Sequence, residues 1–148
     1  MTVFKAYDVR AVYPDPLCEE TARSIGLATG RLLLSEADGR SKVVVGYDMR
    51  LSSPSLVTAL KDGLLEVGCD VVDVGLVDTP FIAFAVNHLD AIGGIQTTAS
   101  HNPAQYNGFK ICRAKAKPVG MGTGLEKIQA MAEGKIEPKI EISRGLES

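Results

Sequence analysis

Three short apolar stretches, separated by segments with helical spacing, constrain the fold of this chain more than any other feature. Residues 43–47 (Val-Val-Val-Gly-Tyr), 70–74 (Asp-Val-Val-Asp-Val) and 91–97 (Ala-Ile-Gly-Gly-Ile-Gln-Thr) predict buried strands. Residues 54–67 and 79–88 lie between them and predict helices, because each begins at a Ser-Pro or Thr-Pro pair that suits a helix start. This alternation predicts βαβ units and a sheet with helices on both faces.

The remaining segments extend this pattern. Residues 1–17 predict an extended stretch and a loop, and a helix from about Cys18 to Ser35 is expected from apolar residues at helical spacing. Asn107-Gly108 is a strong hairpin-turn signal, so residues 109–112 are expected to return as an antiparallel fourth strand. Residues 124–133 predict a last amphipathic helix. The predicted fold is a three-layer α/β/α domain with a mixed four-stranded sheet, mostly parallel with one antiparallel strand.

Length and composition narrow the class of protein. The 148 residues suit one domain, over residues 1–135, with 136–148 expected as a linker. The content of 45% hydrophobic and 23% charged residues argues against disorder, and a net charge of −2 without Trp argues against nucleic-acid binding. The sequence contains no run of about 18 apolar residues, which a membrane span would need, and its first residues do not resemble a secretory signal. A cytoplasmic location is therefore expected. The three cysteines are too scattered to predict a disulfide framework or a zinc site.

The densest polar stretch, residues 97–103 (Thr-Thr-Ala-Ser-His-Asn-Pro), directly follows the third predicted strand. Ligands of α/β proteins bind beyond the carboxyl ends of strands, so Ser100 is expected to face a cleft. Asn102 precedes Pro103, which restricts the shape of the loop. The expected hairpin brings Lys110 back beside Ser100.

Three interpretations of this stretch remain open on the residues alone. Acyl transfer by Ser100 and His101 is disfavoured, because adjacent side chains on extended backbone point in opposite directions and no Gly-x-Ser-x-Gly elbow is present. In a phosphate site, Ser100 would carry a phosphoryl group with a charge of roughly −1.5 to −2, Lys110 would offset that charge, and His101 would move a proton. A loop of mutually satisfied polar groups is the structural alternative.

Three stretches resemble the α-D-phosphohexomutases, the phosphomannomutase and phosphoglucomutase enzymes. Residues 98–103 (Thr-Ala-Ser-His-Asn-Pro), with residues 106–110 (Tyr-Asn-Gly-Phe-Lys) after them, closely resemble the family's phosphoserine loop. Residues 4–10 (Phe-Lys-Ala-Tyr-Asp-Val-Arg) resemble its N-terminal signature, and residues 46–53 (Gly-Tyr-Asp-Met-Arg-Leu-Ser-Ser) resemble its Gly-x-Asp-x-Arg-x-Ser connection. The resemblance extends from about residue 3 to residue 135.

The resemblance implies a role for each matched residue. Ser100 would hold the catalytic phosphoryl group, His101 and Lys110 would assist proton transfer and stabilise charge, and Arg10 would reach toward the same group. Tyr7 and Asn102 are candidates for contacts with the phosphate or the substrate. Mg²⁺ would take one ligand here, through the phosphate on Ser100, and a hexose 1,6-bisphosphate would serve as intermediate and activator. The expected substrates are hexose phosphates.

Differences from the family pattern limit what the chain is expected to do. Ala11 stands where the family usually has Gly, so a requirement for positive φ there would shift the loop around Arg10. The family's metal-binding, sugar-selecting and phosphate-holding loops of domains II, III and IV do not occur in this sequence. The chain therefore resembles the first domain, and without domains II–IV it is expected to be inactive as a mutase.

Two other functions are alternatives to a mutase domain. A free-standing, non-catalytic phosphosugar-binding module would keep the same loop. A dinucleotide-binding domain is disfavoured, because no Gly-x-Gly-x-x-Gly follows the first predicted strand. Residues 120–124 (Gly-Met-Gly-Thr-Gly) are rich in glycine but do not follow a strand closely, and they predict a flexible loop.

Overall fold

One mixed β-sheet organises the computed structural model, which describes residues 3–134 and 145–148. Its strands are β1 (Val9–Val12), β2 (Lys42–Tyr47), β3 (Asp70–Leu76), β4 (Gly93–Thr97) and β5 (Tyr106–Arg113), in the order β1-β5-β4-β2-β3. Strand β2 pairs in parallel with β3 and β4, whereas β5 pairs antiparallel with β4 and β1. The predicted α/β class is confirmed, and the predicted strand number is corrected from four to five.

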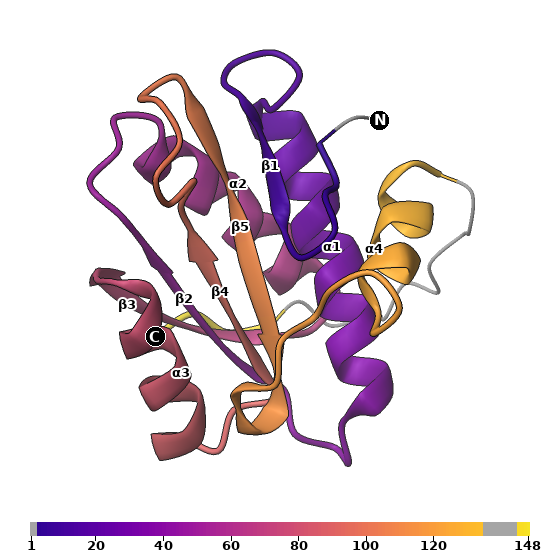
Figure 1. Ribbon diagram of the computed structural model, residues 1–148. Coiled ribbons are helices and arrows are strands. Elements are labelled where there is room, and N and C mark those ends of the chain that lie inside the picture. The colour runs from indigo at the N-terminus through magenta and orange to yellow at the C-terminus, as the bar shows by residue number, and fades with distance from the viewer. Residues whose placement is uncertain (1–2, 135–144) are drawn as a thin grey trace.

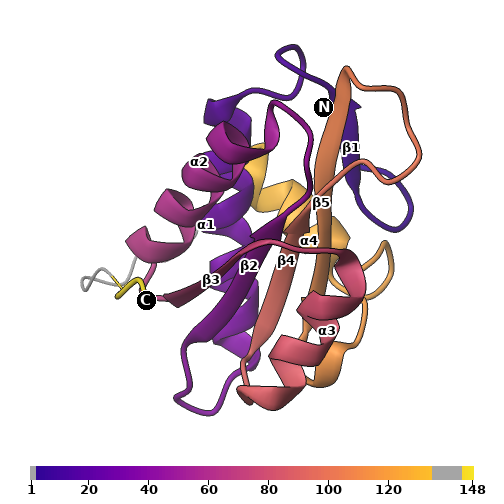
Figure 2. The same cartoon turned by 90° about the vertical axis from the view of Figure 1, so that its left-hand side faces the viewer.

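Helices cover both faces of this sheet, as the sequence predicts. Helices α1 (Glu19–Glu36) and α2 (Ser53–Glu66) lie on one face, and α3 (Thr79–His88) lies on the other (Figures 1 and 2). A single 3-10 turn, η1 (Ala114–Ala116), follows β5, and α4 (Leu125–Ala132) packs beside α1. Each predicted helix is present, with bounds that differ from the expected ones by at most one residue.

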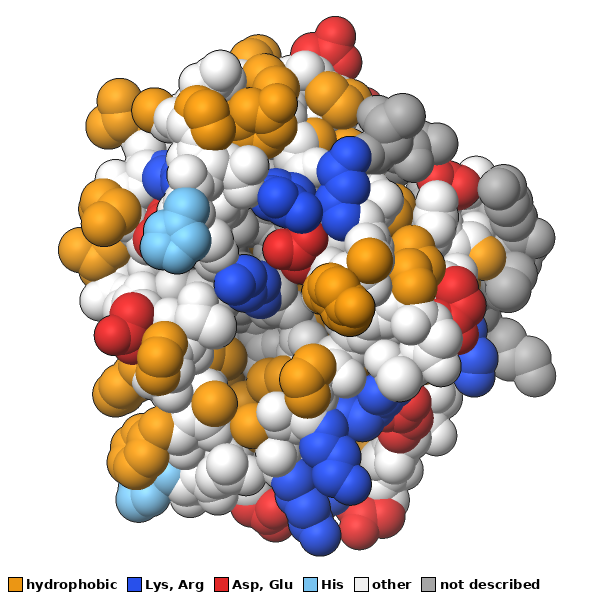
Figure 3. Space-filling view, in the orientation of Figure 1, with side chains coloured by type: hydrophobic (Ala, Val, Ile, Leu, Met, Phe, Trp, Pro, Cys, Tyr) orange, Lys and Arg blue, Asp and Glu red, His pale blue; other side chains and the backbone are white. Residues whose placement is uncertain are grey.

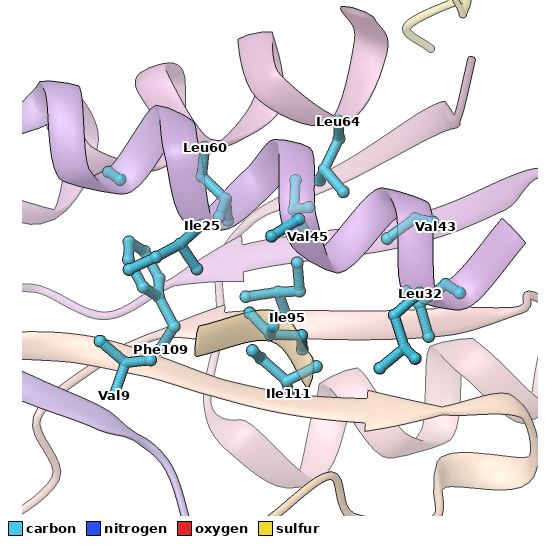
Figure 4. Close-up of a cluster of buried hydrophobic side chains, with 14 of the residues drawn as sticks. Val9, Ile25, Leu32, Val43, Val45, Leu60, Leu64, Ile95, Phe109 and Ile111 are labelled. Carbon is cyan, nitrogen blue, oxygen red and sulfur yellow. The ribbon is translucent and has the colours of Figure 1, made fainter. Parts of the chain in front are cut away.

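The alternation of side chains along the strands divides the core between the two faces. Val43 and Val45 belong to the larger cluster, against α1 and α2, whereas Val44 packs with Ile82 and Val86 of α3 in a smaller cluster. Figure 4 shows the larger cluster, to which α1 contributes Ile25 and Leu32, α2 contributes Leu60 and Leu64, and the sheet contributes Val9, Ile95, Phe109 and Ile111.

The predicted turn at Asn107-Gly108 is wrong, because both residues lie within β5. Asn107 is fully buried, and its amide nitrogen donates to the hydroxyls of Ser52 and Ser53 at 2.8 and 3.0 Å. A Cβ at Gly108 would lie 1.9 Å from the carbonyl oxygen of Val9. The glycine therefore allows β1 to approach β5, and the chain reverses instead in the loop of residues 98–105.

The N-terminal stretch contains the fifth strand, which the sequence analysis treated only as extended chain. Arg10 pairs with Gly108, and Ala11 pairs with Asn107, in a continuous antiparallel register. Ala11 is buried and has no positive φ, so the strand accepts alanine at this position without strain. Strand β1 thereby holds Arg10 beside β5.

The last four residues lie against the outer edge of the sheet. Val71 of β3 donates its N–H to the carbonyl of Leu146 at 2.7 Å and accepts from the N–H of Ser148 at 2.8 Å. Most of the expected linker, at 136–144, lies outside the described residues. Among the helices that the structure describes, none is long and apolar enough to cross a membrane.

Candidate active site

A cavity of about 890 Å³ opens where β4 ends and β5 returns beside it. It is bounded by the loop of residues 98–105, by β1 and β5, and by the start of α3. Figure 3 shows a hollow on this face, with Lys or Arg side chains and a histidine around it. All six residues that the sequence predicts for the site line this cavity, namely Tyr7, Arg10, Ser100, His101, Asn102 and Lys110. Their roles stay predictions, but the fold brings all six together.

Ser100 occupies an unusual backbone conformation. Its φ of +56° lies in the left-handed region, which is uncommon for a residue with a Cβ and occurs often at functional sites. Its N–H donates to Thr98 Oγ1 at 3.0 Å, and both the backbone and side-chain nitrogens of Asn102 donate to the carbonyl of Ala99. The loop is thus internally bonded, while Ser100 and His101 are exposed.

Asp48 and Arg50, at the end of β2, connect this loop to the rest of the domain. Asp48 accepts from Ser53 Oγ and Thr98 Oγ1, both at 2.7 Å. Arg50 donates to four carbonyl oxygens between Ser100 and Tyr106. The sequence analysis did not identify Arg50 as a partner of the Ser100 loop, because spacing alone does not show that the side chain reaches 50 residues along the chain.

The opposite side of the cavity carries two cationic side chains whose N–H groups lack hydrogen-bond acceptors among the described residues. Arg10 Nε lies 3.5 Å from Asp8, too far for a hydrogen bond, and it has no hydrogen-bond acceptor among the described residues. Lys110, directly across the strand pair from Gln96, has no ion-pair or hydrogen-bond partner in the described part of the chain. Unpaired donors beside an exposed hydroxyl suit the binding of an anion.

Two other groups in the cavity are less suited to chemistry. Burial raises the pKa of the Cys112 thiol to about 11, so it is protonated at neutral pH and is a poor nucleophile. The buried Gln96 side chain donates to the carbonyl of Val77 at 2.7 Å, which holds the start of α3 against β4. Gln96 was not predicted, because a single glutamine in an apolar strand carries no functional signal.

The glycine-rich stretch at 120–124 does not offer free amides to a nucleotide. The N–H groups of Gly122 and Gly124 donate to the carboxylate of Glu126 at 2.9 and 3.1 Å. Gly124 directly precedes α4, so the carboxylate occupies the position that a ligand phosphate takes at a helix N-terminus. These two amides are therefore already engaged within the chain.

The residues available for Mg²⁺ are few. Among residues 3–134 and 145–148, no three His, Cys, Asp or Glu side chains gather closely enough to hold a metal ion. The described residues by themselves therefore do not fit a complete Mg²⁺ site, and an oxygen on Ser100 is the one ligand that the sequence analysis assigns to this chain.

The fold and the site define an α/β domain that presents a serine beyond the carboxyl end of β4, with two cations on the neighbouring strands β1 and β5. The model of the family "Phosphoglucomutase/phosphomannomutase, alpha/beta/alpha domain I" matches residues 1–138. The chain belongs to this family.

Relatives and solved structures extend the comparison. A phosphomannomutase of Vibrio cholerae is 47% identical over 90% of this chain, which spans 29% of that protein. A phosphomannomutase of Klebsiella pneumoniae is 46% identical over 97% of this chain, which spans 88% of it. The crystal structure of a phosphoglucomutase/phosphomannomutase family protein from Burkholderia thailandensis is 37% identical, with a TM-score of 0.84, over 99% of this chain and 32% of that one. This chain thus corresponds to less than a third of the longer proteins.

Proposed function

We propose that this chain is the phosphoserine-bearing first domain of a phosphohexomutase, which interconverts hexose 1-phosphate and hexose 6-phosphate. The observation that carries the proposal is the cavity itself, in which the exposed Ser100 lies with Arg10 and Lys110, two cations that lack full partners. Family membership and the names of the relatives favour mannose or glucose as the sugar.

The reaction consists of two phosphoryl transfers through Ser100 Oγ. In the first, the Oγ–P bond breaks and the phosphorus bonds to the free hydroxyl oxygen of the hexose monophosphate, while the hydroxyl proton passes to Oγ. The product is a hexose 1,6-bisphosphate. In the second, Oγ bonds to the other phosphorus, that sugar O–P bond breaks, and the proton returns to the sugar oxygen. Such transfer depends mainly on positioning and on electrostatic stabilisation.

The residues around Ser100 supply these two needs. Arg10 and Lys110 stabilise the charge that is shared among the phosphoryl oxygens as the bonds exchange. His101, next to Ser100 and exposed in the same cavity, carries the proton between Oγ and the sugar hydroxyl. Tyr7 is 85% exposed at the cavity rim and, together with Asn102, contacts the phosphate or the sugar.

Mg²⁺ and the remaining domains complete this site. Bound Mg²⁺ would polarise phosphoryl oxygens, but the described residues offer it only an oxygen on Ser100, so no step above is assigned to it. Because the chain spans 29% of the Vibrio cholerae relative, domains II–IV would bind the sugar and its second phosphate. The isolated chain is expected to lack mutase turnover.

A chimera tests the proposal. Residues 1–138 would replace the matching segment of the Vibrio cholerae phosphomannomutase, and turnover of mannose 1-phosphate and glucose 1-phosphate would be measured. Turnover is expected, and Ser100→Ala should lower it by at least about 10³-fold because the nucleophile is lost. Ser55→Ala, at an exposed serine of α2, is the matched control and should keep turnover.

The chimera also separates a mutase domain from a binding module. Mass spectrometry of the peptide that contains Ser100 should show one added phosphoryl group after incubation with a hexose 1,6-bisphosphate. Undiminished turnover in the Ser100→Ala chimera, or a phosphoryl group on another residue, would refute the role of Ser100. A folded chimera that binds hexose phosphates without turning them over would favour the non-catalytic module.

A further inference from the structure

Arg50 makes four hydrogen bonds to the loop that carries Ser100, and no motif in the sequence predicts them. One of its terminal nitrogens donates to the carbonyls of Pro103 and Tyr106, at 2.7 and 3.1 Å. The other donates to the carbonyls of Ser100 and Asn102, at 2.9 and 2.8 Å. A single guanidinium therefore fixes four peptide groups across the loop.

The terminal donors of Arg50 are fully used by these contacts. Its two terminal nitrogens carry four N–H groups, which match the four carbonyls, and Nε lies 3.3 Å from the carboxylate of Asp48. The side chain is only 12% exposed. Arg50 therefore has no terminal donor left for a ligand. In Arg10, by contrast, the side chain is 37% exposed and Nε has no hydrogen-bond acceptor among the described residues.

The contact with Ser100 also orients the peptide group that follows it. The bond between Ser100 and His101 is trans, so its C=O and N–H point in opposite directions. With the C=O directed to Arg50, the N–H of His101 is directed away from it. That N–H has no hydrogen-bond acceptor among the described residues, and His101 lines the cavity.

We propose that Arg50 is a positioning residue, which holds Ser100 in its left-handed conformation and so directs both Oγ and the His101 N–H toward a bound phosphoryl group. The proposal rests on the function inferred above for Ser100. It assigns to Arg50 a role that acts through the backbone of the loop, without contact with the substrate. Asp48 supports the role, because it contacts both Arg50 and Thr98, whose hydroxyl accepts from the Ser100 N–H.

The planar guanidinium suits this role better than a lysine ammonium would. A guanidinium presents five donors in a rigid fork, whereas an ammonium presents three donors from one point. An ammonium near position 50 could reach only some of the four carbonyls. Arg50→Lys therefore keeps the charge while it removes part of the bonding, and it separates geometry from charge.

Amide hydrogen exchange in the 148-residue chain tests the loop directly and does not depend on catalysis. In Arg50→Lys, the amides of Asn102 and Tyr106, which are bonded within the loop, should exchange at least about tenfold faster. The chemical shifts of Ser100 should lose their left-handed signature, while Ile95 of β4 keeps its protection. Arg23→Lys is the matched control, because Arg23 bonds to Asp62 and Glu66 between α1 and α2, and it should leave the loop unchanged.

Chemical rescue distinguishes positioning from a general loss of stability. In Arg50→Ala, dilute guanidinium, far below denaturing concentration, should restore slow exchange at Asn102 and the shifts of Ser100, whereas equal sodium chloride should not. Wild-type exchange and Ser100 shifts in Arg50→Lys would overturn the proposal. So would an Arg50→Ala chain that stays folded and keeps its loop protected without added guanidinium.

A second measurement connects the loop to chemistry. The rate at which a hexose 1,6-bisphosphate phosphorylates Ser100 in the chimera should fall about 10- to 100-fold in Arg50→Lys, as expected for a misplaced reacting group. An unchanged rate would overturn the proposal. If the chimera with Arg50 intact is not phosphorylated at Ser100, the proposed function of Ser100 fails, while the exchange data still decide whether Arg50 holds the loop.

Discussion

The two sides of the cavity differ in how their polar atoms are satisfied. On the side of the 98–105 loop, both terminal nitrogens of Arg50 donate to carbonyls, and Asp48 accepts three hydrogen bonds from within the chain. On the side of β1 and β5, Arg10 has only a 3.5 Å approach to Asp8, and Lys110 has no partner among the described residues. Satisfied groups fix geometry, whereas unsatisfied donors remain available to a ligand.

This difference separates two kinds of charged residue in one site. A mutation on the loop side removes bonds that the chain already makes, so it should alter structure first and chemistry as a consequence. A mutation on the cation side removes bonds that form only when a phosphoryl group is present, so it should alter chemistry with little effect on folding. Measuring both activity and stability for mutations on each side therefore tests the comparison between the two sides.

The largest effect is expected on the cation side. In the chimera, Lys110→Ala and Arg10→Ala should each lower turnover by about 10²–10³-fold, because each removes a donor that stabilises phosphoryl charge in the transition state. The free energy of unfolding of the 148-residue chain should change by no more than about 0.5 kcal/mol, since neither side chain makes a strong bond within it. Turnover assays and thermal unfolding provide the two readouts.

Lys115→Ala is the matched control for charge on this face. Lys115 is exposed in the turn that follows β5 and does not line the cavity. Its removal should leave turnover nearly unchanged. The comparison between the two sides would fail if Lys110→Ala destabilised the fold as much as Arg50→Ala, or if Lys115→Ala and Lys110→Ala lowered turnover equally.

The residues proposed to react are easier to predict from the sequence than the bonds that hold them in place. Ser100, His101 and Lys110 lie in one polar loop and the strand after it, so a simple strand-and-return argument brings them together. Arg10 and Tyr7 entered only through resemblance to a family, because no spacing argument connects residues near position 10 to position 100. Strand β1 makes that connection, through its register with β5.

The bonds that hold the loop could not be predicted, because they join the Arg50 side chain to distant backbone carbonyls. The carbonyls that Arg50 contacts are common to every residue type, so they leave no pattern in the sequence. The left-handed φ of Ser100 carries no signal either, since the sequence has serine where glycine or asparagine would indicate it. Asn107-Gly108 gave a misleading signal, because tertiary contacts of both residues override the local preference for a turn.

Gly108→Ala should move Arg10 without touching the bonds of Arg50. The new Cβ would lie 1.9 Å from the Val9 carbonyl, a backbone atom that no rotamer change can withdraw, so β1 must shift from β5. We expect a loss of about 3 kcal/mol in the free energy of unfolding, at the upper end for overpacking, and lower turnover in the chimera. Chemical denaturation measures the loss in the free energy of unfolding. Amide exchange compares β1 with the loop.

In that variant, amides of β1 should exchange faster, while the Asn102 amide in the loop keeps its protection. Gly39→Ala is the control. Ala6→Gly would be unsuitable, because it adds flexibility near Arg10. Gly39 lies in an exposed turn with no atom near its Cβ position, although its positive φ makes the substitution mildly unfavourable. Equal exchange changes in β1 and in the loop of Gly108→Ala would mean that the two sides are not independent.

The smallest effect concerns Glu126, whose carboxylate satisfies the amides of Gly122 and Gly124 much as a ligand anion would. Backbone hydrogen bonds lower the pKa of this carboxyl. Because the pKa is lower in the folded chain, the stabilisation is present above the ordinary pKa of glutamate and is lost as the pH falls through the lowered value. Glu126→Gln keeps an acceptor oxygen but cannot titrate, so stability should decline less steeply with acid, as measured by thermal unfolding between neutral pH and about pH 3. An unchanged pH dependence would show that these amides do not favour an anion.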